Sequence, residues 1–327
     1  MKSVVIPLVA AIALTGCSSL NSPKCKCQSG SLVGNWGLKL PYENMNAGHL
    51  IVEQNDDGSY KGLMLWRWAS PVPTKYVKVG KNGQFELQHA WGEIVKGQVI
   101  GDTIVAEAFT NGKKLGTLVG WRNSPICPKA STKNAKFGEG IDLLADGLDG
   151  WVSMEEKAKF GWSIVEEDGV KVLSNKLGLK ADGSWAGGGA NLRTKRDDFF
   201  DFHLSYDVRV PAKSNSGVYL RGRYEIQVVD SFGKTPDCHN MAAYYGRVTP
   251  SVAAEKAPGQ WQHVEVTLYK RHLTVELNGK VIIDDVPVVG ITGGAIDANE
   301  NIAGPIYLQG DHSDADFKNM ILRPAVD

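Results

Sequence analysis

Short runs of alternating apolar and polar residues recur along the chain, and no convincing long stretch has helical periodicity. The clearest alternation is at residues 216–230, SGVYLRGRYEIQVVD. Its polar positions carry a phenol, a guanidinium, a carboxylate and an amide: Tyr219, Arg221, Glu225 and Gln227. Gly222 interrupts the run, so we expect two strands joined by a tight turn. One face of this hairpin then carries more kinds of polar functional group than a solvent-exposed face requires.

The length of this turn decides which residues face each other. A two-residue loop would place Glu225 beside the apolar Leu220. A three-residue loop or a glycine bulge would set Arg221 opposite Glu225, and Tyr219 opposite Gln227. We expect this second register, because it directs four apolar side chains to the core: Val218, Leu220, Ile226 and Val228. A solvated ladder with an Arg–Glu pair across the strands is the alternative.

Residues 31–125 predict a first domain made only of strands. Turn signals such as Asn82-Gly83 and Asn111-Gly112 separate eight short runs. The expected strands are residues 35–40, 49–53, 60–68, 75–79, 84–89, 98–100, 103–109 and 115–121. Eight short antiparallel strands indicate a small closed barrel or a sandwich. Gly34-Asn35-Trp36 resembles the Gly-x-Trp of lipocalin-like barrels, which favours the barrel.

The third of these runs has two partly apolar faces. Met64, Trp66 and Trp68 share one face, and Leu63, Leu65 and Arg67 belong to the other. One face therefore fills the barrel, and the other packs on the second domain or on a sugar.

Two prolines and several polar residues at 124–136 indicate a domain boundary, and a second domain is expected at residues 137–327. A short helix is expected at residues 153–160. The expected strands are residues 170–174, 189–194, 201–210, 216–221, 224–230, 263–269, 272–277, 280–284 and 306–309. Many strands without crossover helices predict an antiparallel two-sheet sandwich of the jelly-roll kind.

The N-terminus reads as a targeting segment. Lys2 supplies the positive charge, and residues 4–14 form an apolar stretch too short for a stable membrane span. Leu14-Thr15-Gly16-Cys17 resembles the lipobox of bacterial lipoproteins. The resemblance implies a signal peptide at residues 1–16, lipidation of Cys17 and a tether at residues 17–30. We therefore expect an envelope protein held by a lipid anchor, at the outer membrane if the cell is Gram-negative, because Ser18 stands where Asp would retain it.

The net charge of the chain limits the kinds of partner that it can bind, and its cysteines limit the covalent pairs that it can form. Lys+Arg and Asp+Glu both number 36 and no long basic run exists, which argues against nucleic acid as a partner. Cys25 or Cys27 could pair with Cys127 across the first domain in an oxidising compartment. Cys238 is expected to be an isolated buried cysteine, with a soft ligand pair with His239 as the alternative.

The second half carries a series of motifs in a characteristic order. They are Asp146-Gly147, Gly150-Trp151, Leu192-Arg193-Thr194-Lys195, Asn215-Ser216-Gly217-Val218-Tyr219-Leu220-Arg221, Tyr224-Glu225-Ile226-Gln227, Pro258-Gly259-Gln260-Trp261, Leu277-Asn278-Gly279, Ile306-Tyr307-Leu308-Gln309-Gly310-Asp311-His312 and Asp316-Phe317-Lys318-Asn319. Over about 190 residues this series resembles the 3-keto-disaccharide hydrolase family. The resemblance implies an all-β chain, with a small barrel followed by a concanavalin-A-like jelly roll, and action on oxidised glycosides.

The expected substrate defines the chemistry. A carbonyl at C3 of a sugar acidifies the C2 proton, so the group at C1 can leave by elimination and water can then add to the enone. This reaction needs a base near C2, a positive or hydrogen-bonding group at the C3 oxygen, and an acid at the leaving oxygen.

The candidates for these roles are nine side chains. Glu225, Asp230 and His312 could act as base or acid, and we favour His312 or Glu225 as the base. Arg221 and Lys195 could stabilise an enolate. The expected hydroxyl-binding residues are Tyr219, Gln227, Gln309 and Tyr307.

Two other arrangements stay open. A divalent metal that polarises the ketone could be held by Glu225, His312 and either Asp230 or His239. Glu225 and Asp230 could also form the carboxylate pair of an ordinary glycosidase, although strand parity sends them to opposite faces.

Three functions are therefore compatible with the sequence. The leading one is an envelope-anchored enzyme, a hydrolase or lyase that cleaves 3-keto-glycosides. The alternatives are a non-catalytic carbohydrate-binding lipoprotein and a structural envelope protein.

Overall fold

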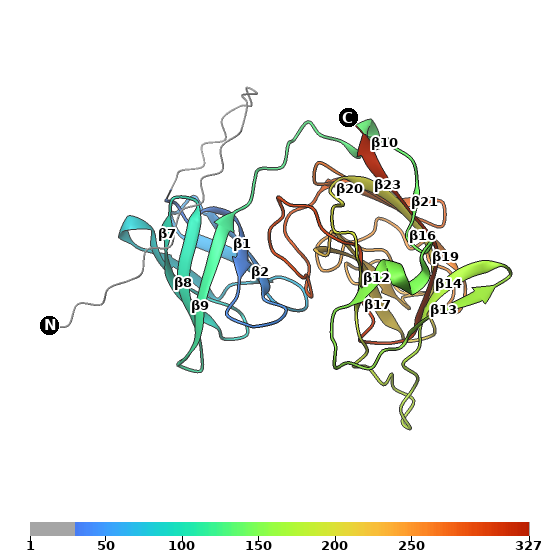
Figure 1. Ribbon diagram of the computed structural model, residues 1–327. Coiled ribbons are helices and arrows are strands. Elements are labelled where there is room, and N and C mark those ends of the chain that lie inside the picture. The colour runs from blue at the N-terminus through green and yellow to red at the C-terminus, as the bar shows by residue number, and fades with distance from the viewer. Residues whose placement is uncertain (1–29, 327) are drawn as a thin grey trace.

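A computed structural model of the chain describes residues 30–326 and contains strands, turns and short 3-10 helices in that range (Figure 1). The expected signal peptide, the lipidation at Cys17, most of the tether, and Cys25 and Cys27 lie outside the described residues. Within the described part, no helix has the length and apolar character needed to cross a membrane.

The first strands close into a barrel, as the turn spacing predicted. Its eight strands are β1 Gly34–Lys39, β2 Ala47–Gln54, β3 Tyr60–Trp66, β5 Tyr76–Val79, β6 Gln84–Gln88, β7 Ile94–Ile100, β8 Thr103–Thr110 and β9 Lys113–Arg122. All neighbouring pairs are antiparallel in the order β2-β1-β9-β8-β7-β6-β5-β3, and β2 also pairs with β3. The short β4 (Val72–Pro73) lies outside this ring, paired with β3.

The barrel is filled by side chains from alternate strand positions. Trp36, Met64 and Trp66 are fully buried in its core. For Met64 and Trp66 this follows the alternation in the third run, whereas Trp68, expected on the same face, is 45% exposed. The indole of Trp36 donates to the carbonyl of Leu32 at 2.8 Å. Leu65, on the opposite face of β3, packs into the core of the second unit, so both faces of this strand are buried.

The second unit begins after an extended connection and is a two-sheet sandwich. Its strands are β10 Lys136–Phe137, β11 Ile141–Asp142, β12 Trp151–Ser153, β13 Trp162–Glu167, β14 Val170–Asn175, β15 Leu192–Thr194, β16 Phe202–Arg209, β17 Asn215–Leu220, β18 Tyr224–Val229, β19 Gln262–Tyr269, β20 His272–Leu277, β21 Lys280–Pro287, β22 Tyr307–Leu308 and β23 Ala315–Val326. One sheet has the order β13-β14-β23-β16-β19-β20-β21, with β10 and β11 paired to β23. The other has the order β12-β15-β22-β17-β18. The all-β prediction, a barrel followed by a sandwich, is confirmed.

The sandwich core follows from the alternation in its strands. In β16, Phe202, Leu204, Tyr206 and Val208 are fully buried, and the residues between them are partly exposed. Four side chains of the hairpin face this core as expected: Val218, Leu220, Ile226 and Val228. Asn278 and Gly279 both have positive φ, which gives the tight turn between β20 and β21.

The predicted helix at residues 153–160 is wrong. Residues 153–160 form turns and the end of β12 instead of a helix, because the Glu155 carboxylate accepts hydrogen bonds from the backbone and side chain of Asn191. The twelve-residue β23 was not expected. Its alternation is broken where Asn319 has positive φ (52°) and the register against β16 shifts, so its buried residues do not keep a period of two.

The expected hairpin register is also wrong. The turn has three residues, but it pairs Leu220 with Tyr224, and therefore Tyr219 with Glu225. Arg221 leaves the ladder and enters the turn with φ 54°. Gln227 lies opposite Gly217 instead of Tyr219.

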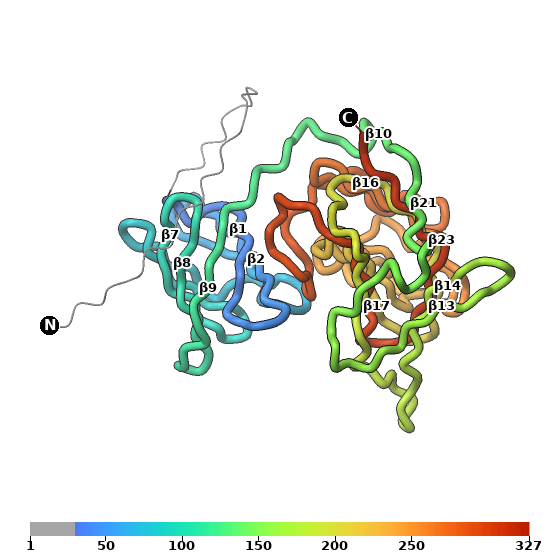
Figure 2. The backbone as a smooth tube through the Cα atoms, in the orientation of Figure 1, coloured from blue at the N-terminus to red at the C-terminus, as the bar shows by residue number. Residues whose placement is uncertain are grey.

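A polar, buried seam joins the barrel to the sandwich. Figure 2 shows the orange-red loop of residues 288–303 lying against the barrel. The amide of Asn123 donates to Asn35 Oδ1 at 3.0 Å and to Glu300 Oε2 at 2.7 Å. Arg271 Nη2 lies 3.1 Å from the same Glu300 oxygen, and His49 Nε2 lies 2.5 Å from Asn35 Oδ1. The hydrogen bond between Asn123 and Glu300 joins the two units, and the other contacts hold its two partners in position.

Candidate functional site

Polar side chains form a row across the five-stranded sheet. Arg193 of β15 is opposite Tyr307 of β22, and Tyr307 is opposite Tyr219 of β17. Tyr219 is in turn opposite Glu225 of β18. Directly opposed residues share one face of a sheet, so this row lies on the face turned away from the core. The row joins segments more than one hundred residues apart in the chain.

A pocket of about 170 Å³ lies over one end of this row, and we call it the Glu225 pocket. It is lined by Met45, Trp68, Ala69, Asn215, Tyr219, Glu225, Gln227, Tyr245, Gly293, Gly294, Gln309, Asp311 and His312. Five residues predicted from the sequence are therefore brought together: Glu225, His312, Tyr219, Gln227 and Gln309. Met45, Trp68 and Ala69 come from the barrel, so both units build the pocket.

Glu225 is the buried acid of this pocket, with only 3% of the residue exposed. Its carboxyl group lies over Gly217, where any Cβ would collide with it, so a glycine on β17 makes the room it occupies. Burial raises the pKa of Glu225 to about 8, the Tyr219 hydrogen bond opposes this rise, and the charge of Asp311 adds to it. Near neutral pH this carboxyl group is therefore mainly protonated.

Tyr219 can also pair with the protonated form of this carboxyl group. Its hydroxyl oxygen lies 2.9 Å from Glu225 Oε2 and 2.8 Å from the carbonyl oxygen of Gly293. A phenol has one proton, so it cannot donate to both acceptors. If Glu225 is protonated, it donates to the phenol and the phenol donates to Gly293, which satisfies all three groups. The Tyr219 ring is fixed by stacking on Tyr307, with ring centroids 4.2 Å apart.

His312 is at the exposed end of the pocket, with 48% of its side chain exposed. Its Nδ1 lies 2.5 Å from Asp311 Oδ1, and this hydrogen bond raises the pKa of His312 above its ordinary value while burial opposes the rise. Gly310 packs against the Ala190 carbonyl and the Trp162 indole, where a side chain would not fit. The need for glycine here is close packing, since its φ is not positive.

Three amide side chains line the same pocket. The Oε1 of Gln227 accepts from the backbone N–H of Val228 at 2.8 Å, which leaves its NH₂ group for the pocket. Gln309 Oε1 and Asn215 Oδ1 are buried and have no hydrogen-bond partner among the described residues. Since buried polar atoms are nearly always paired, these two oxygens are suited to accept hydrogen bonds from ligand hydroxyls.

Four other predicted residues are not brought into the pocket. Arg221 is fully buried in the hairpin turn and donates to the carbonyls of Glu300 and Ile302. Lys195 is exposed and does not line this pocket. Tyr307 lies beneath Tyr219 and is fully buried. Asp230 accepts from the backbone N–H of Lys213 outside the pocket, so it does not pair with Glu225 there.

Asp230 and His239 line an adjoining hollow of about 630 Å³. We call it the Asp230 groove, and it is lined by Lys213, Ser214, Asn215, Gln227, Val229, Asp230, Phe232, Lys234, His239, Asn240 and Tyr245. Asn215, Gln227 and Tyr245 line both hollows, so the groove continues from the Glu225 pocket.

The ligand set expected for a metal does not assemble in the described residues. The one group of three close ligand atoms found there is Asp237, Cys238 and His239, which are consecutive and at or near the surface. Glu225 and His312 belong to no such group, although both line the pocket.

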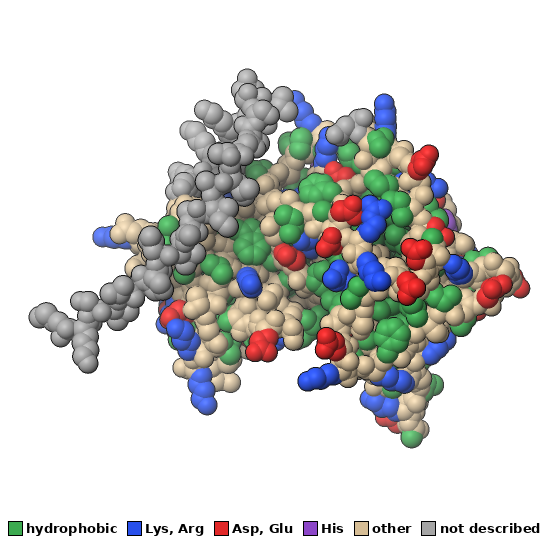
Figure 3. All heavy atoms as spheres, viewed as in Figure 1, with side chains coloured by type: hydrophobic (Ala, Val, Ile, Leu, Met, Phe, Trp, Pro, Cys, Tyr) green, Lys and Arg blue, Asp and Glu red, His purple; other side chains and the backbone are tan. Residues whose placement is uncertain are grey.

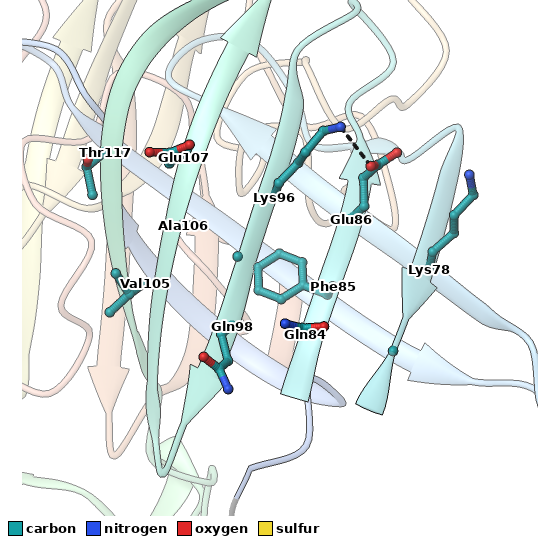
Figure 4. A pocket seen from close by; sticks show the side chains of 12 residues that line it. Lys78, Gln84, Phe85, Glu86, Lys96, Gln98, Val105, Ala106, Glu107 and Thr117 are labelled. Atoms are coloured by element: carbon teal, nitrogen blue, oxygen red, sulfur yellow. Dashed lines mark ion pairs between the residues drawn. The ribbon is translucent and has the colours of Figure 1, made fainter. Parts of the chain in front are cut away.

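A further hollow of about 740 Å³ lies on the outside of the barrel. Figure 4 shows Lys96 paired with Glu86 on neighbouring strands, at 3.0 Å, in this surface. The hollow contains none of the predicted site residues. Basic and acidic side chains are also interspersed over the visible face of the whole molecule (Figure 3), as its zero net charge leads one to expect.

Comparison with known proteins shows the family to which the sandwich is similar. A family model described as a 3-keto-alpha-glucoside-1,2-lyase-like domain matches residues 140–323. None of the curated proteins matches the chain.

Solved structures give distant likenesses. Two crystal structures from Parabacteroides distasonis ATCC 8503, both provisionally assigned as glycosyl hydrolases, are 24% and 23% identical to this chain. Each covers 57% of this chain, and the match covers 84% and 100% of theirs, with TM-scores of 0.43 and 0.42. The carbohydrate binding module CBM66 from Bacillus subtilis is 13% identical over 52% of this chain and 93% of its own, with a TM-score of 0.30.

Proposed function

This chain belongs to the family of 3-keto-alpha-glucoside-1,2-lyase-like domains, and from that membership we propose that it cleaves glycosides of 3-keto sugars by elimination. The observation that carries the proposal is a buried carboxyl group with a pKa near 8 in the same pocket as a histidine–aspartate pair. An elimination across C1 and C2 needs one proton acceptor and one proton donor, and these two groups can supply them.

His312 is the proposed base. Its Nδ1 is held by Asp311, so Nε2 is the atom available to take a proton from a substrate. The exposed position of the ring at the end of the pocket lets the proton pass on to water. Asp311 also stabilises the imidazolium that forms, as a carboxylate does beside a catalytic histidine.

Glu225 is the proposed acid. Its raised pKa keeps the proton on the carboxyl group near neutral pH, which is the form that can protonate a departing oxygen. The pairing with Tyr219 and the space above Gly217 hold the group in one position. Since a positioned acid or base contributes about 10²- to 10⁴-fold to a rate, loss of either group should be easy to measure.

Amide side chains take the role that was predicted from the sequence for the cations Arg221 and Lys195, which was to stabilise the enolate. Arg221 and Lys195 lie outside the pocket, so we assign the C3 oxygen to the NH₂ group of Gln227. Gln309 and Asn215 accept hydrogen bonds from the sugar hydroxyls. Neutral donors suit this role because they stabilise the developing enolate charge without a buried cation.

The step balances without a co-reactant. His312 takes the C2 proton, the C2–H electron pair forms the C1–C2 double bond, and the C1–O bond breaks. Glu225 gives its proton to the departing oxygen. The products are an alcohol and a 1,2-unsaturated 3-keto sugar, and water can then add across the double bond.

A paired assay tests this function. A chromogenic 3-keto-glycoside and its unoxidised parent are incubated with the protein, with and without a chelator. Release from the oxidised compound alone supports elimination. Release from the parent contradicts elimination and supports ordinary hydrolysis, and release from neither supports a carbohydrate-binding lipoprotein. If the chelator abolishes release of the chromophore, a divalent metal takes part in the reaction.

A matched pair of histidine variants tests in the same assay whether His312 is the base. His312→Asn should lose activity, whereas His263→Asn should keep it. His263 makes a similar pair with Asp207, at 2.7 Å, and 46% of its side chain is exposed, but it lies outside the pocket. Equal activity of the two variants would remove His312 from the mechanism.

The location of the enzyme is a second proposal. The Leu14-Thr15-Gly16-Cys17 motif supports a lipid anchor at Cys17 in the cell envelope. Metabolic labelling with a fatty acid analogue should label the protein and fail to label the Cys17→Ala variant. An unlabelled wild type would contradict the anchor.

A further inference from the structure

The barrel sends one loop to the mouth of the Glu225 pocket. Residues 67–70, which we call the barrel loop, follow β3 directly. The carbonyl of Arg67 accepts from the backbone N–H of Gly294 at 2.8 Å. Ser70 Oγ lies 2.7 Å from His239 Nε2, so both ends of the loop are tied to the sandwich. Between these ties, the backbone of Ala69 lies against Gly293, where no side chain would fit.

The loop holds Trp68 in a constrained conformation. Arg67 has φ 71° and Ala69 has φ 59°, so both neighbours of Trp68 adopt the left-handed conformation that non-glycine residues rarely take. Strained backbone of this kind persists where the surrounding contacts determine it, and it clusters at binding sites. Here Arg67 supplies those contacts, because its guanidinium donates to the carbonyls of Met45 and Asn44 at 2.9 and 3.1 Å.

The indole of Trp68 is supported on one side and open on another. The Arg67 guanidinium lies 4.3 Å from its ring and 3.8 Å from the ring of Tyr42, so it is sandwiched between the two. Trp68 is nevertheless 45% exposed and lines the Glu225 pocket. Trp36 and Trp66 of the same barrel are fully buried in its core. A large aromatic side chain kept at a pocket mouth, with its neighbours strained, is not needed for barrel packing.

The chemistry of the pocket indicates what Trp68 would contact. Its other walls carry a carboxyl group, amides and phenols that bind hydroxyls, whereas a sugar ring also has an apolar face of C–H groups. An indole offers a flat apolar surface of that size. We propose that Trp68 is a stacking platform for the sugar ring, so the barrel is part of the substrate site and the sugar subsite is shared between the two units. This inference rests on the proposed function, since it takes the same pocket as the place where the keto sugar binds.

Three variants of the full-length protein test the platform. Trp68→Ala should raise KM for the 3-keto-glycoside about 10-fold or more and change kcat less, because it removes binding contact without touching the acid or the base. Trp68→Phe keeps an aromatic plane and should restore most of the affinity. Trp91→Ala is the matched control, since Trp91 is 51% exposed on the barrel and lines neither hollow. Equal KM values for Trp68→Ala and wild type would overturn the platform and leave the proposed function intact.

Calorimetric binding of the 3-keto-glycoside separates the two proposals. Binding by wild type without cleavage would overturn the lyase function, and the platform would then stand if Trp68→Ala loses this binding and Trp91→Ala keeps it. If wild type neither binds nor cleaves the compound, both proposals are wrong. If Trp68→Ala has the circular dichroism spectrum and melting temperature of wild type, misfolding is excluded as the cause of a loss of binding. If it misfolds, Trp68→Leu takes its place, because it removes the aromatic plane and keeps apolar bulk, and a KM equal to that of Trp91→Ala would then overturn the platform.

Discussion

Tyr219 and Glu225 lie directly opposite each other on β17 and β18, and the phenol oxygen is 2.9 Å from the carboxyl oxygen. This pair makes the protonation state of one buried acid the central property of the site. Because the charged form of Glu225 is disfavoured by burial, both the stability and the activity of the protein should depend on pH through this residue.

The first prediction concerns stability. The pKa of Glu225 is raised from an ordinary 4.5 to about 8, so the folded state holds a proton that the unfolded state has lost between these values. The stability that this proton contributes is complete below pH 4.5 and is lost as pH rises to about 8. Wild type should therefore lose roughly 1.4 kcal/mol per pH unit relative to Glu225→Gln across this window. Urea unfolding at a series of pH values measures the difference, and parallel curves for the two proteins would contradict it.

The second prediction concerns the rate. Elimination needs neutral His312 and protonated Glu225, so kcat/KM should follow a bell-shaped profile. Its acid limb should lie above the ordinary histidine value of 6.5, and its alkaline limb near 8. Asp311 raises the pKa of both groups, so Asp311→Asn should move both limbs to lower pH. A profile that keeps its alkaline limb in Glu225→Gln would assign that limb to another group.

The third prediction concerns the space above β17. Gly217→Ala places a methyl group where the Glu225 carboxyl group lies, and Gly217 has no positive φ, so the collision is the main effect. Displacing a catalytic group by about 1 Å can cost on the order of 10²-fold, so kcat should fall by that amount. Gly80→Ala is the control, because its nearest contact is 3.6 Å away and its φ is also not positive. Similar kcat values in both variants would show that the position of Glu225 does not limit the rate.

The fourth prediction concerns the seam. Glu300 is fully buried between Arg271 and Asn123, and it also accepts from the backbone N–H of Gly290 at 3.0 Å. Glu300→Ala removes the carboxylate partner of the buried Arg271 guanidinium and should cost about 3–5 kcal/mol of stability. The surface pair of Glu53 and Lys61 is the comparison, and Glu53→Ala should cost less than about 1 kcal/mol. Chemical denaturation measures both, and equal losses would mean that the seam is not held by its charges.

The sequence predicted the strands well where alternation is regular. The barrel strands and the core face of β16 follow a period of two, so their buried residues could be read directly. The hairpin was also found, but its register was not. The three turn residues set the pairing, and they moved Arg221 from the ladder into a buried turn.

Part of the candidate site could also be predicted from the sequence. Glu225, His312 and Gln309 are polar residues on strands and turns with a recognisable motif, and the structure brings them into one pocket. The contribution of Trp68 and Ala69 could not be derived, because it depends on how two units meet. No local pattern encodes that a barrel loop reaches a sheet whose residues are about 150 positions later in the chain.

The seam contains glycines at its narrowest points. Gly37 packs against the Ala298 carbonyl, Gly290 against the His49 ring, and Gly293 against the backbone of Ala69. A single methyl group at any of these positions would push the barrel away from the sandwich. The width of the pocket mouth therefore depends on residues that, apart from Gly293, do not line the pocket, and substrate breadth in this architecture can evolve by one-carbon changes at a distance from the chemistry.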